Sequence, residues 1–531
     1  MHKKENHLKG GINISNALEI VDSINVSNGT IASGGNITLV STASKTARIA
    51  RIVNGGVSGD VVAQRFIPGG AGKRKWRFLS SPINNGAGGI QLTEYIDDIH
   101  VTGMGGSANG FDNCTCLPSI RFYNETLNAI ADSGWRNPST INYQVNTGFA
   151  VEVFVRGSRS TPDPFLGTSV PDNTTIDYIG AINSGAITIN LSYTNNGITN
   201  SDGFNLVGNP YPSQIDWMAS GWTKTNIDRF FWSYNPDASN PIYGGFDPNS
   251  GLGTNGVTRF IPSGMGFFVK ANNTGAQLGF TETVKSTGTP YNFFKGSSVA
   301  ASKYPHIRIV AGDSLISDET ILLFDSSASA NKTDLSDIMK LFNPTINFYS
   351  KSKDNISLAF NQLPFPSNIK EDTINFSMFV FKDNSIRVGA YYMYLKELVD
   401  IPAWLGVDVL DRFTNIRTNI KDNPYNFNIE NTTGSHGNNR LALILYHKPT
   451  GIENTTKQFG IYPNPAQNTT NISNYNNSIR SIKIFDMKSS LVKEINDVNQ
   501  SIDVSDLIAE IYLIYIQTDK GTEIHKTIIQ K

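Results

Sequence analysis

The stretch Ser481-Ile482-Lys483-Ile484-Phe485-Asp486 places apolar side chains at alternate positions, which is the pattern of a half-buried β-strand. Pro463 and Pro465 bracket a turn upstream of it, because proline fixes φ and cannot donate to a strand ladder. Similar short segments surround this stretch, at 459–465, 470–473, 491–492, 502–507, 511–516 and 524–529. Residues 459–531 are therefore predicted to fold as a seven-stranded sandwich.

The rest of the chain is also predicted to be all-β. Charged residues make up only 17% of the 531 residues, and the 47 glycines favour turn-rich architecture over helices. A chain of this length divides into three or four domains at roughly 150 residues each. The expected fold is several antiparallel β-sandwich domains in tandem, immunoglobulin-like or jelly-roll-like.

The pattern of strand and turn signals predicts the domain boundaries. Residues 1–63 alternate in short segments broken by Asn-Gly and Gly-Gly, which are typical of hairpins or solenoid-like rungs at the end of a larger region. Residues 303–448 carry regular strand signals of a further sandwich, interrupted by one predicted helix at 333–341. Polar residues at 449–458 form a linker before the last domain, 459–531.

Residues 64–295 form a β-sandwich region that contains a degenerate internal repeat, 64–160 and 190–285. Each half has an aromatic-led strand ending in a Pro turn, then an aromatic strand, then a strand begun by Gly. Chance similarity among strand-rich sequences is the alternative. The three matching pieces are 76–82 with 204–210, 121–124 with 231–235, and 145–151 with 261–269.

The last domain closely resembles the type A C-terminal sorting domain of the type IX secretion system of Gram-negative bacteria. One position departs from the family pattern, because Glu510 stands where the family usually has Gly before Ile-Tyr, and a turn that needs φ > 0 would be strained there. The residues that carry the motifs are Tyr462, Pro463, Asn464, Pro465, Phe485, Asp486, Asp503, Val504, Leu507, Tyr512, Lys526 and Lys531.

This resemblance implies that an outer-membrane secretion and attachment machinery reads the domain and often cleaves it. The protein is then expected outside the cell or on the outer cell surface, released or attached to surface polysaccharide. The upstream regions are similar to uncharacterised secreted proteins with the same terminus. The start of the chain lacks the apolar core of a secretory signal, so we hypothesise that the sequence is a mature form or that its natural start lies upstream. A terminal sandwich without a sorting role is the alternative.

Several functional classes find no support in the sequence. The net charge is −1, which disfavours nucleic-acid partners, and no run approaches the ~20 apolar residues of a spanning helix. The sequence holds no nucleophile elbow, His-Glu-x-x-His helix, phosphate loop or dinucleotide fingerprint, so no catalytic residue is assigned. Glu94, Asp97 and Asp98 could serve a glycosidase, although a solvated face is the favoured interpretation.

The upstream domains are predicted to serve adhesion or ligand binding. Trp217, Trp222 and Tyr243 lie beside turns and could stack on sugar rings of a host or environmental glycan, although core packing is the favoured interpretation. The alternative function is a secreted carbohydrate-active protein, either a glycan-binding module or a glycoside hydrolase. No cofactor is predicted; Asp247 and Asn249 have the spacing of calcium ligands, but a plain turn is favoured.

Overall fold

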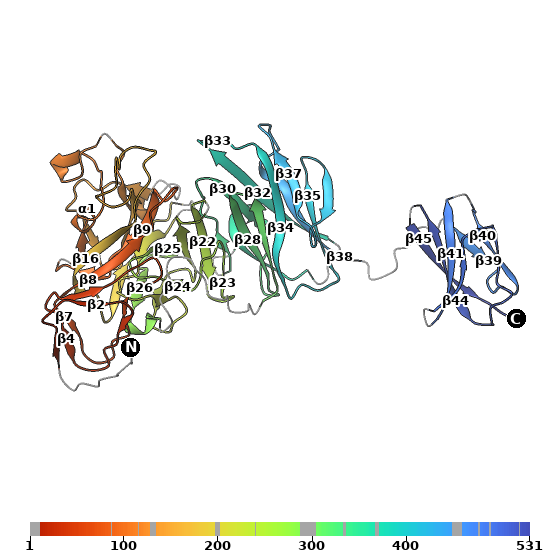
Figure 1. Ribbon diagram of the computed structural model, residues 1–531, viewed down its shortest axis with the longest axis horizontal. Coiled ribbons are helices and arrows are strands. Elements are labelled where there is room, and N and C mark those ends of the chain that lie inside the picture. The colour runs from red at the N-terminus through yellow and green to blue at the C-terminus, as the bar shows by residue number, and fades with distance from the viewer. Residues whose placement is uncertain are drawn as a thin grey trace. The chain divides into compact units, whose positions relative to one another are not determined.

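The computed structural model describes residues 11–86, 88–114, 116–127, 134–196, 202–238, 240–286, 304–332, 336–366, 371–448, 459–475, 478–487, 490–519 and 521–531. Strands dominate these ranges, and the helices among them are only three or four residues long, which confirms the predicted all-β class. The chain divides into two compact units, Met1–His447 and Lys448–Lys531. Figure 1 shows the strands of both units.

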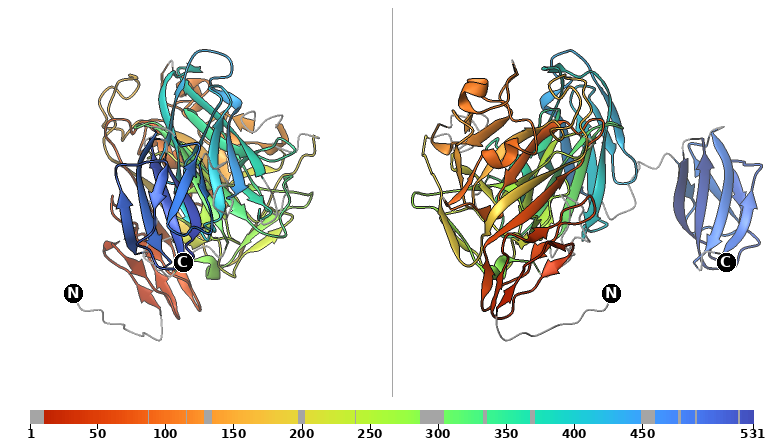
Figure 2. Two further views of the ribbon diagram at one scale, coloured as in Figure 1. Left: turned by 90° about the vertical axis from the view of Figure 1, so that its right-hand side faces the viewer. Right: turned by 60° about the vertical axis from the view of Figure 1, so that its left-hand side comes forward.

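The first unit begins with rungs of a parallel β-solenoid. Strand β4 lies between β1 and β7, β5 lies between β2 and β8, and β3 pairs with β6, all in parallel. The Asn-Gly and Gly-Gly breaks therefore connect successive rungs and do not close hairpins. Both views of Figure 2 show these red strands together at one end of the unit. Their bounds are β1 Ile12–Asn13, β2 Leu18–Ile20, β3 Ser23–Ile24, β4 Thr30–Ala32, β5 Ile37–Leu39, β6 Arg48–Ile49, β7 Gly56–Ser58 and β8 Asp60–Ile67.

The first half of the repeat follows β8, which also pairs with β16 in the antiparallel sense. Its main sheet has the order β13-β12-β15-β9, and one face of that sheet covers the core that the rungs and β16 also line. The elements are β9 Lys75–Ser80, β10 Ile83–Asn84, β11 Gly89–Gln91, α1 Thr93–Ile96, η1 Gly106–Asn109, β12 Ile120–Tyr123, η2 Glu125–Leu127, β13 Trp135–Arg136, β14 Gln144–Asn146, β15 Ala150–Val155 and β16 Thr174–Ile182.

The second half repeats this topology in the sheet β18-β25-β21-β22-β23. Here β18 pairs with β25 and β25 with β21, as β9 pairs with β15 and β15 with β12 in the first half. The elements are β17 Ile187–Asn190, β18 Phe204–Gly208, β19 Ile215–Asp216, β20 Thr223–Thr225, β21 Phe231–Asn235, β22 Ile242–Asp247, β23 Leu252–Gly253, β24 Phe260–Ile261, β25 Gly266–Lys270, β26 Gln277–Phe280 and η4 Glu282–Val284.

The two halves also agree in register. Ser80 lies opposite Ala150 in the first sheet, and Gly208 lies opposite Gly266 in the second, at the positions that the repeat equates. The halves meet reciprocally, because the Ser80 N–H donates to the Gly264 carbonyl (3.1 Å) and the Gly208 N–H donates to that of Gly148 (2.8 Å). This exchange gives the pair a pseudo-twofold relation, which chance similarity does not explain.

The rest of the first unit is a 12-stranded sheet that curls around its own core. Its order runs from β36 to β37, and β29 and β33 pair beside this path. The hydroxyl of Tyr425 in β37 donates to Asp411 in β35 (2.8 Å), so the two ends of the sheet approach each other. The strands are β27 His306–Gly312, β28 Ser317–Phe324, β29 Ile338–Met339, β30 Ile346–Lys351, β31 Ser357–Leu363, β32 Glu371–Lys382, β33 Ser385–Ile386, β34 Gly389–Val399, β35 Leu405–Asp411, β36 Ile416–Asn419, β37 Tyr425–Ile429 and β38 Gly437–His447.

The helix predicted at 333–341 is wrong for the residues of that span that the structure describes. Ile338 and Met339 form β29 and pair with β31, while 333–335 lie outside the described residues. Tertiary contacts override the helical pattern, because Ile338 is fully buried in a core cluster shared with Trp232, whose indole N–H donates to the Met339 carbonyl (2.9 Å). The same cluster joins the second half of the repeat to the 12-stranded sheet.

The second unit is a small sandwich with its own core. One sheet has the order β39-β40-β43 and the other β42-β41-β44-β45. The linker predicted at 449–458 lies outside the described residues. The strands are β39 Gly460–Tyr462, β40 Thr469–Ser473, β41 Ile479–Asp486, β42 Leu491–Ile495, β43 Ser501–Asp503, β44 Ile511–Thr518 and β45 Gly521–Ile528.

Candidate functional site

Several of the sorting-motif residues form the interior of the second unit. Val504, Leu507 and Tyr512 are buried in its core, and the Tyr512 hydroxyl donates to the Ile508 carbonyl (3.3 Å). Phe485 is half-buried and packs edge-on against Tyr515, with ring centroids 4.8 Å apart. Val504, Leu507 and Tyr512 hold the two sheets together, whereas Phe485 and Tyr515 belong to the same sheet and lie outside this core.

A second group of motif residues fixes turns and chain ends. The Asn464 side chain donates to the Lys526 carbonyl (2.9 Å) and accepts from the Ile528 N–H (2.8 Å), so it fastens the opening turn to β45. Asp486 accepts from the Ser490 N–H (2.8 Å), and Asp503 accepts from the Ser505 N–H (2.9 Å). The Lys531 ammonium donates to the Ser505 carbonyl.

The remaining motif residues face the solvent. Tyr462 is 48% exposed, and Pro463, Pro465 and Lys526 are exposed too. Because these side chains contribute little to the core, they are the members of the motif that a partner could touch. The strain expected at Glu510 is wrong: its backbone is not among those with positive φ, and its carbonyl accepts from the Ile529 N–H (2.9 Å).

Trp217 is not the accessible ligand contact that the sequence suggested. Only 1% of it is exposed, and its indole N–H donates to the Arg229 carbonyl (2.7 Å). Trp222 is half-buried beside it, with ring centroids 4.8 Å apart. Lys224 occupies the ring faces, since its Nζ lies 3.5 Å from the Trp217 centroid and 5.5 Å from that of Trp222. The chain therefore fills this aromatic site with its own lysine side chain, whose pKa burial lowers to about 7.

The other sequence-based ligand candidates lie elsewhere and serve structural contacts. Tyr243 is half-buried in a different cluster, where its N–H donates to the Asn343 side chain (2.8 Å). Asp247 is 1% exposed; one carboxylate oxygen accepts from Arg229 Nε (2.8 Å) and the other from the Ser250 N–H (3.0 Å). Asn249 lies in the same turn, and its N–H also donates to Asp247 (3.2 Å). The Asp247 carboxylate is therefore bonded to the Arg229 guanidinium and to the backbone of its own turn.

The acidic residues near the start of the repeat fasten a helix to a strand. Glu94 accepts from the Ile179 N–H (3.1 Å) and Asp98 from the Asp177 N–H (2.7 Å), so α1 is held against β16. Both are half-buried, which corrects the solvated face favoured from sequence for these two residues, while Asp97 is exposed as that interpretation expects. Burial, together with the neighbouring carboxylates, raises the pKa of Asp98 to about 6.

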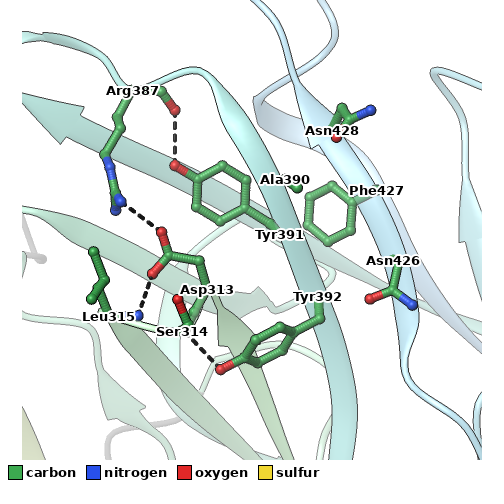
Figure 3. A pocket seen from close by; sticks show the side chains of 10 residues that line it. All are labelled: Asp313, Ser314, Leu315, Arg387, Ala390, Tyr391, Tyr392, Asn426, Phe427 and Asn428. Carbon is green, nitrogen blue, oxygen red and sulfur yellow. Dashed lines mark hydrogen bonds and ion pairs between the residues drawn. The ribbon is translucent and has the colours of Figure 1, made fainter.

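A surface trough of about 470 Å³ lies on the 12-stranded sheet. Figure 3 shows the Asp313 turn on one side of β34, with Asn426 and Asn428 of β37 on the other. Asn426 lies opposite Tyr392 in the register, and Asn428 lies opposite Ala390, so these four side chains share one face. The residues that line the trough are Asp313, Ser314, Leu315, Arg387, Ala390, Tyr391, Tyr392, Asn426, Phe427 and Asn428.

Hydrogen bonds hold the Asp313 side of the trough in place. The Tyr392 hydroxyl donates to the Asp313 carbonyl (2.7 Å), and the Tyr391 hydroxyl donates to that of Arg387 (2.9 Å). The Arg387 guanidinium lies 2.7 Å from the Asp313 carboxylate, which also accepts from the N–H groups of Leu315 and Ile316. The aromatic side chains are therefore fixed before any ligand arrives.

This trough was not predicted, although the sequence holds a signal for it. The run Tyr425-Asn426-Phe427-Asn428-Ile429 alternates apolar and amide side chains, as expected of a strand that presents two asparagines on its outer face. Their function could not be inferred, because Asp313, Arg387 and Tyr392 come from other parts of the chain.

A second cavity of about 360 Å³ lies by Arg229 and Asp325, where Asp325 accepts from Ser327 and Gln362.

Within the described ranges no three His, Cys, Asp or Glu side chains gather closely enough to hold a metal ion. Cys114 and Cys116 form a disulfide with each other. No helix in the described part of the chain has the length and apolar character needed to cross a membrane.

Comparison with protein families defines the class of the second unit. The model described as "Secretion system C-terminal sorting domain" matches residues 460–530, so the chain is a type IX secretion substrate, exported to the cell surface or extracellular space. The model described as "Domain of unknown function (DUF8693)" matches residues 108–445, which is more than half of the chain. The chain belongs to this DUF8693 family.

Similarity to individual proteins is low. No curated protein matches the chain. A structure of PorZ, "an essential bacterial surface component of the type-IX secretion system" of Porphyromonas gingivalis, is 14% identical over 17% of this chain and 14% of that one, with a TM-score of 0.13. Dimeric latent PorU from the same organism is 9% identical over 77% of this chain and 43% of that one, with a TM-score of 0.10. At these scores neither structure supports an inference.

Proposed function

We propose that this chain is an exported surface protein whose second unit is the export signal and whose first unit binds ligands outside the cell. The observation that carries this proposal is the self-contained core of the second unit, which combines buried motif residues with an exposed Tyr462 and Lys526. A tag of this kind can be read by a secretion machinery without unfolding the first unit.

The first unit supplies a scaffold suited to adhesion or ligand binding. Solenoid rungs, two related β-sheets and a curled 12-stranded sheet share buried cores, and these rigid elements support a preformed trough. Standard catalytic motifs are absent from the sequence, so binding is the activity that these features support best.

Truncation tests the export part of this proposal. The full chain and a version that ends at Lys448, each behind the same secretory signal, are expressed in a type IX host and located by surface proteolysis and cell fractionation. We expect the full chain at the surface or in the medium and the truncated chain in the periplasm. Surface delivery of the truncated chain would contradict the proposal.

A second candidate function is that of a secreted carbohydrate-active protein. The observation that favours it is the trough, which combines the Tyr392 ring with two exposed asparagine amides. A glycan-binding module is the version that these residues support, since acidic side chains are represented in the lining by Asp313 alone, and Asp313 is paired with Arg387.

A further inference from the structure

We propose that the trough between the Asp313 turn and strand β37 binds a neutral sugar unit within a polysaccharide. This inference deepens the proposed ligand-binding function and depends on it. It concerns Tyr392, Asn426 and Asn428, which lie on one face of the sheet.

The first argument is the hydrogen-bonding capacity of β37. The side chains of Asn426 and Asn428 are exposed, and neither has a hydrogen-bond partner within the described part of the chain. Each amide offers two donors and a carbonyl acceptor. A ligand that presents donors and acceptors together, as the hydroxyl groups of a sugar do, can use both parts of each amide, whereas a simple anion or cation uses only one.

The second argument is the aromatic surface beside these amides. Tyr392 lies opposite Asn426, and its ring is anchored because its hydroxyl donates to the Asp313 carbonyl (2.7 Å). A pyranose ring has an apolar face of C–H groups, and the negatively polarised face of an aromatic ring attracts such groups. Ala390 is the next residue on the same face of β34, two positions before Tyr392, and its small side chain also lines the trough.

The charge of the side chains that line the trough also favours a neutral ligand. Asp313 and Arg387 are the two ionised groups of the lining, and they neutralise each other at 2.7 Å. The trough therefore has no net charge to compensate a uronate, sulfate or phosphate. Both phenols, Tyr391 and Tyr392, are neutral at physiological pH even with an ordinary pKa of 10, and burial raises each pKa further.

The size and shape of the trough also suit one sugar unit of a polymer. A volume of about 470 Å³ lies within the range of about 300–1,000 Å³ that is usual for small-molecule sites. Leu315 at one wall is 65% exposed, and the asparagines at the opposite wall are exposed as well. An open trough of this kind lets a polymer pass through, so an internal sugar unit suits it.

Affinity electrophoresis of the full chain tests this proposal. The gels contain dextran, yeast mannan, laminarin or galactan as neutral polymers, and alginate or polygalacturonate as acidic ones. We expect retardation by at least one neutral polymer and no retardation by the acidic ones. Absence of retardation by all four neutral polymers, or retardation by an acidic polymer alone, would overturn the proposal.

Two variants and a control assign the binding to the trough. The double variant Asn426→Ala/Asn428→Ala should weaken retardation at least tenfold, and Tyr392→Leu should weaken it comparably. Thr418→Ala changes an exposed residue of β36, the strand at the other end of the sheet order, and should leave it unchanged. Equal retardation of the intact chain and the asparagine double variant, with equal thermal midpoints, would contradict binding at the trough. Surface delivery in the truncation experiment reports on export independently of this result.

Discussion

Arg440 is the residue that ties the edge strand of the trough to the sheet. Its guanidinium lies 2.8 Å from the Asp411 carboxylate, and it donates to the Asn428 carbonyl of β37 (2.6 Å). Only 3% of the Arg440 side chain and none of the Asp411 side chain is exposed. Burial acts to raise the pKa of Asp411, but hydrogen bonds from Arg440 and Tyr425 outweigh it and hold that pKa below its ordinary value.

Replacing this arginine should destabilise the first unit strongly. Arg440→Met leaves the Asp411 carboxylate buried and without its cation, and breaking a buried pair in this way costs about 3–5 kcal/mol in the free energy of unfolding. Urea denaturation measures the change. Arg412→Met, which removes an exposed guanidinium bonded to the Asn439 carbonyl and the Asn375 side chain, is the matched control and should cost under about 1 kcal/mol. Equal effects of the two substitutions would contradict the account of Arg440.

Asp98 should give the stability of the first unit a measurable dependence on pH. Its pKa of about 6 in the folded chain exceeds the ordinary 3.8, so the folded state binds its proton more tightly than the unfolded state. The resulting stabilisation is fully present below about pH 4 and is lost as the pH rises through 6. Asp98→Asn keeps an oxygen that can accept from the Asp177 N–H and should flatten the dependence of the thermal midpoint between pH 4 and 6. An unchanged slope in this variant would count against the assignment.

At this scale the sequence predicted residue types better than residue roles. The sequence identified Trp217 and Trp222 as unusual, but it could not show that Lys224 covers their rings, because that contact depends on how β19 and β20 are placed. It also identified Asp247 as a turn residue, while its partner Arg229 lies 18 positions away. The role of a residue cannot be inferred from the sequence where it depends on contacts of this kind, which only the folded structure shows.

Among the elements, the opening turn of the second unit separates structural from accessible motif residues. Asn464→Ala removes both side-chain hydrogen bonds to β45 and should lower the free energy of unfolding of this unit by about 1–3 kcal/mol. Tyr462→Ala changes an exposed side chain and should alter it by less than about 0.5 kcal/mol while still reducing export. Circular dichroism during denaturation and an export assay measure the two effects. Normal export of the Tyr462 variant would show that this side chain is not read.

Strand elements were predictable to a large extent because alternation is a local signal. The repeat was also visible in the sequence, and the shared register of β9–β15 and β18–β25 gives it a structural meaning. The helix expected at 333–341 was wrong because burial of Ile338 and Met339 decided the local conformation. The sequence does not decide between hairpins and parallel rungs for the first strands, since both show a similar alternation of apolar and polar residues.

For the whole molecule, the two compact units should unfold separately. Gly208 reports on the first, because a Cβ at this position would lie 2.2 Å from the Ser80 Cβ and 2.8 Å from the Phe149 carbonyl oxygen, where the two halves of the repeat meet. Gly208→Ala should therefore lower the free energy of unfolding of the first unit by about 1–3 kcal/mol and leave that of the second unit unchanged. Calorimetry measures both transitions. Gly167→Ala has open space around it and is the control. A single transition that shifts as one would contradict the division.

The central claim is that the second unit alone directs export. The most direct measurement attaches residues 455–531 to a fluorescent protein that carries a secretory signal, in a type IX host, and follows where the fluorescence goes. The account predicts fluorescent protein on the cell surface or in the medium, and its loss when the export machinery is disabled. Fluorescence retained in the periplasm, with the fused domain intact and folded, would contradict it.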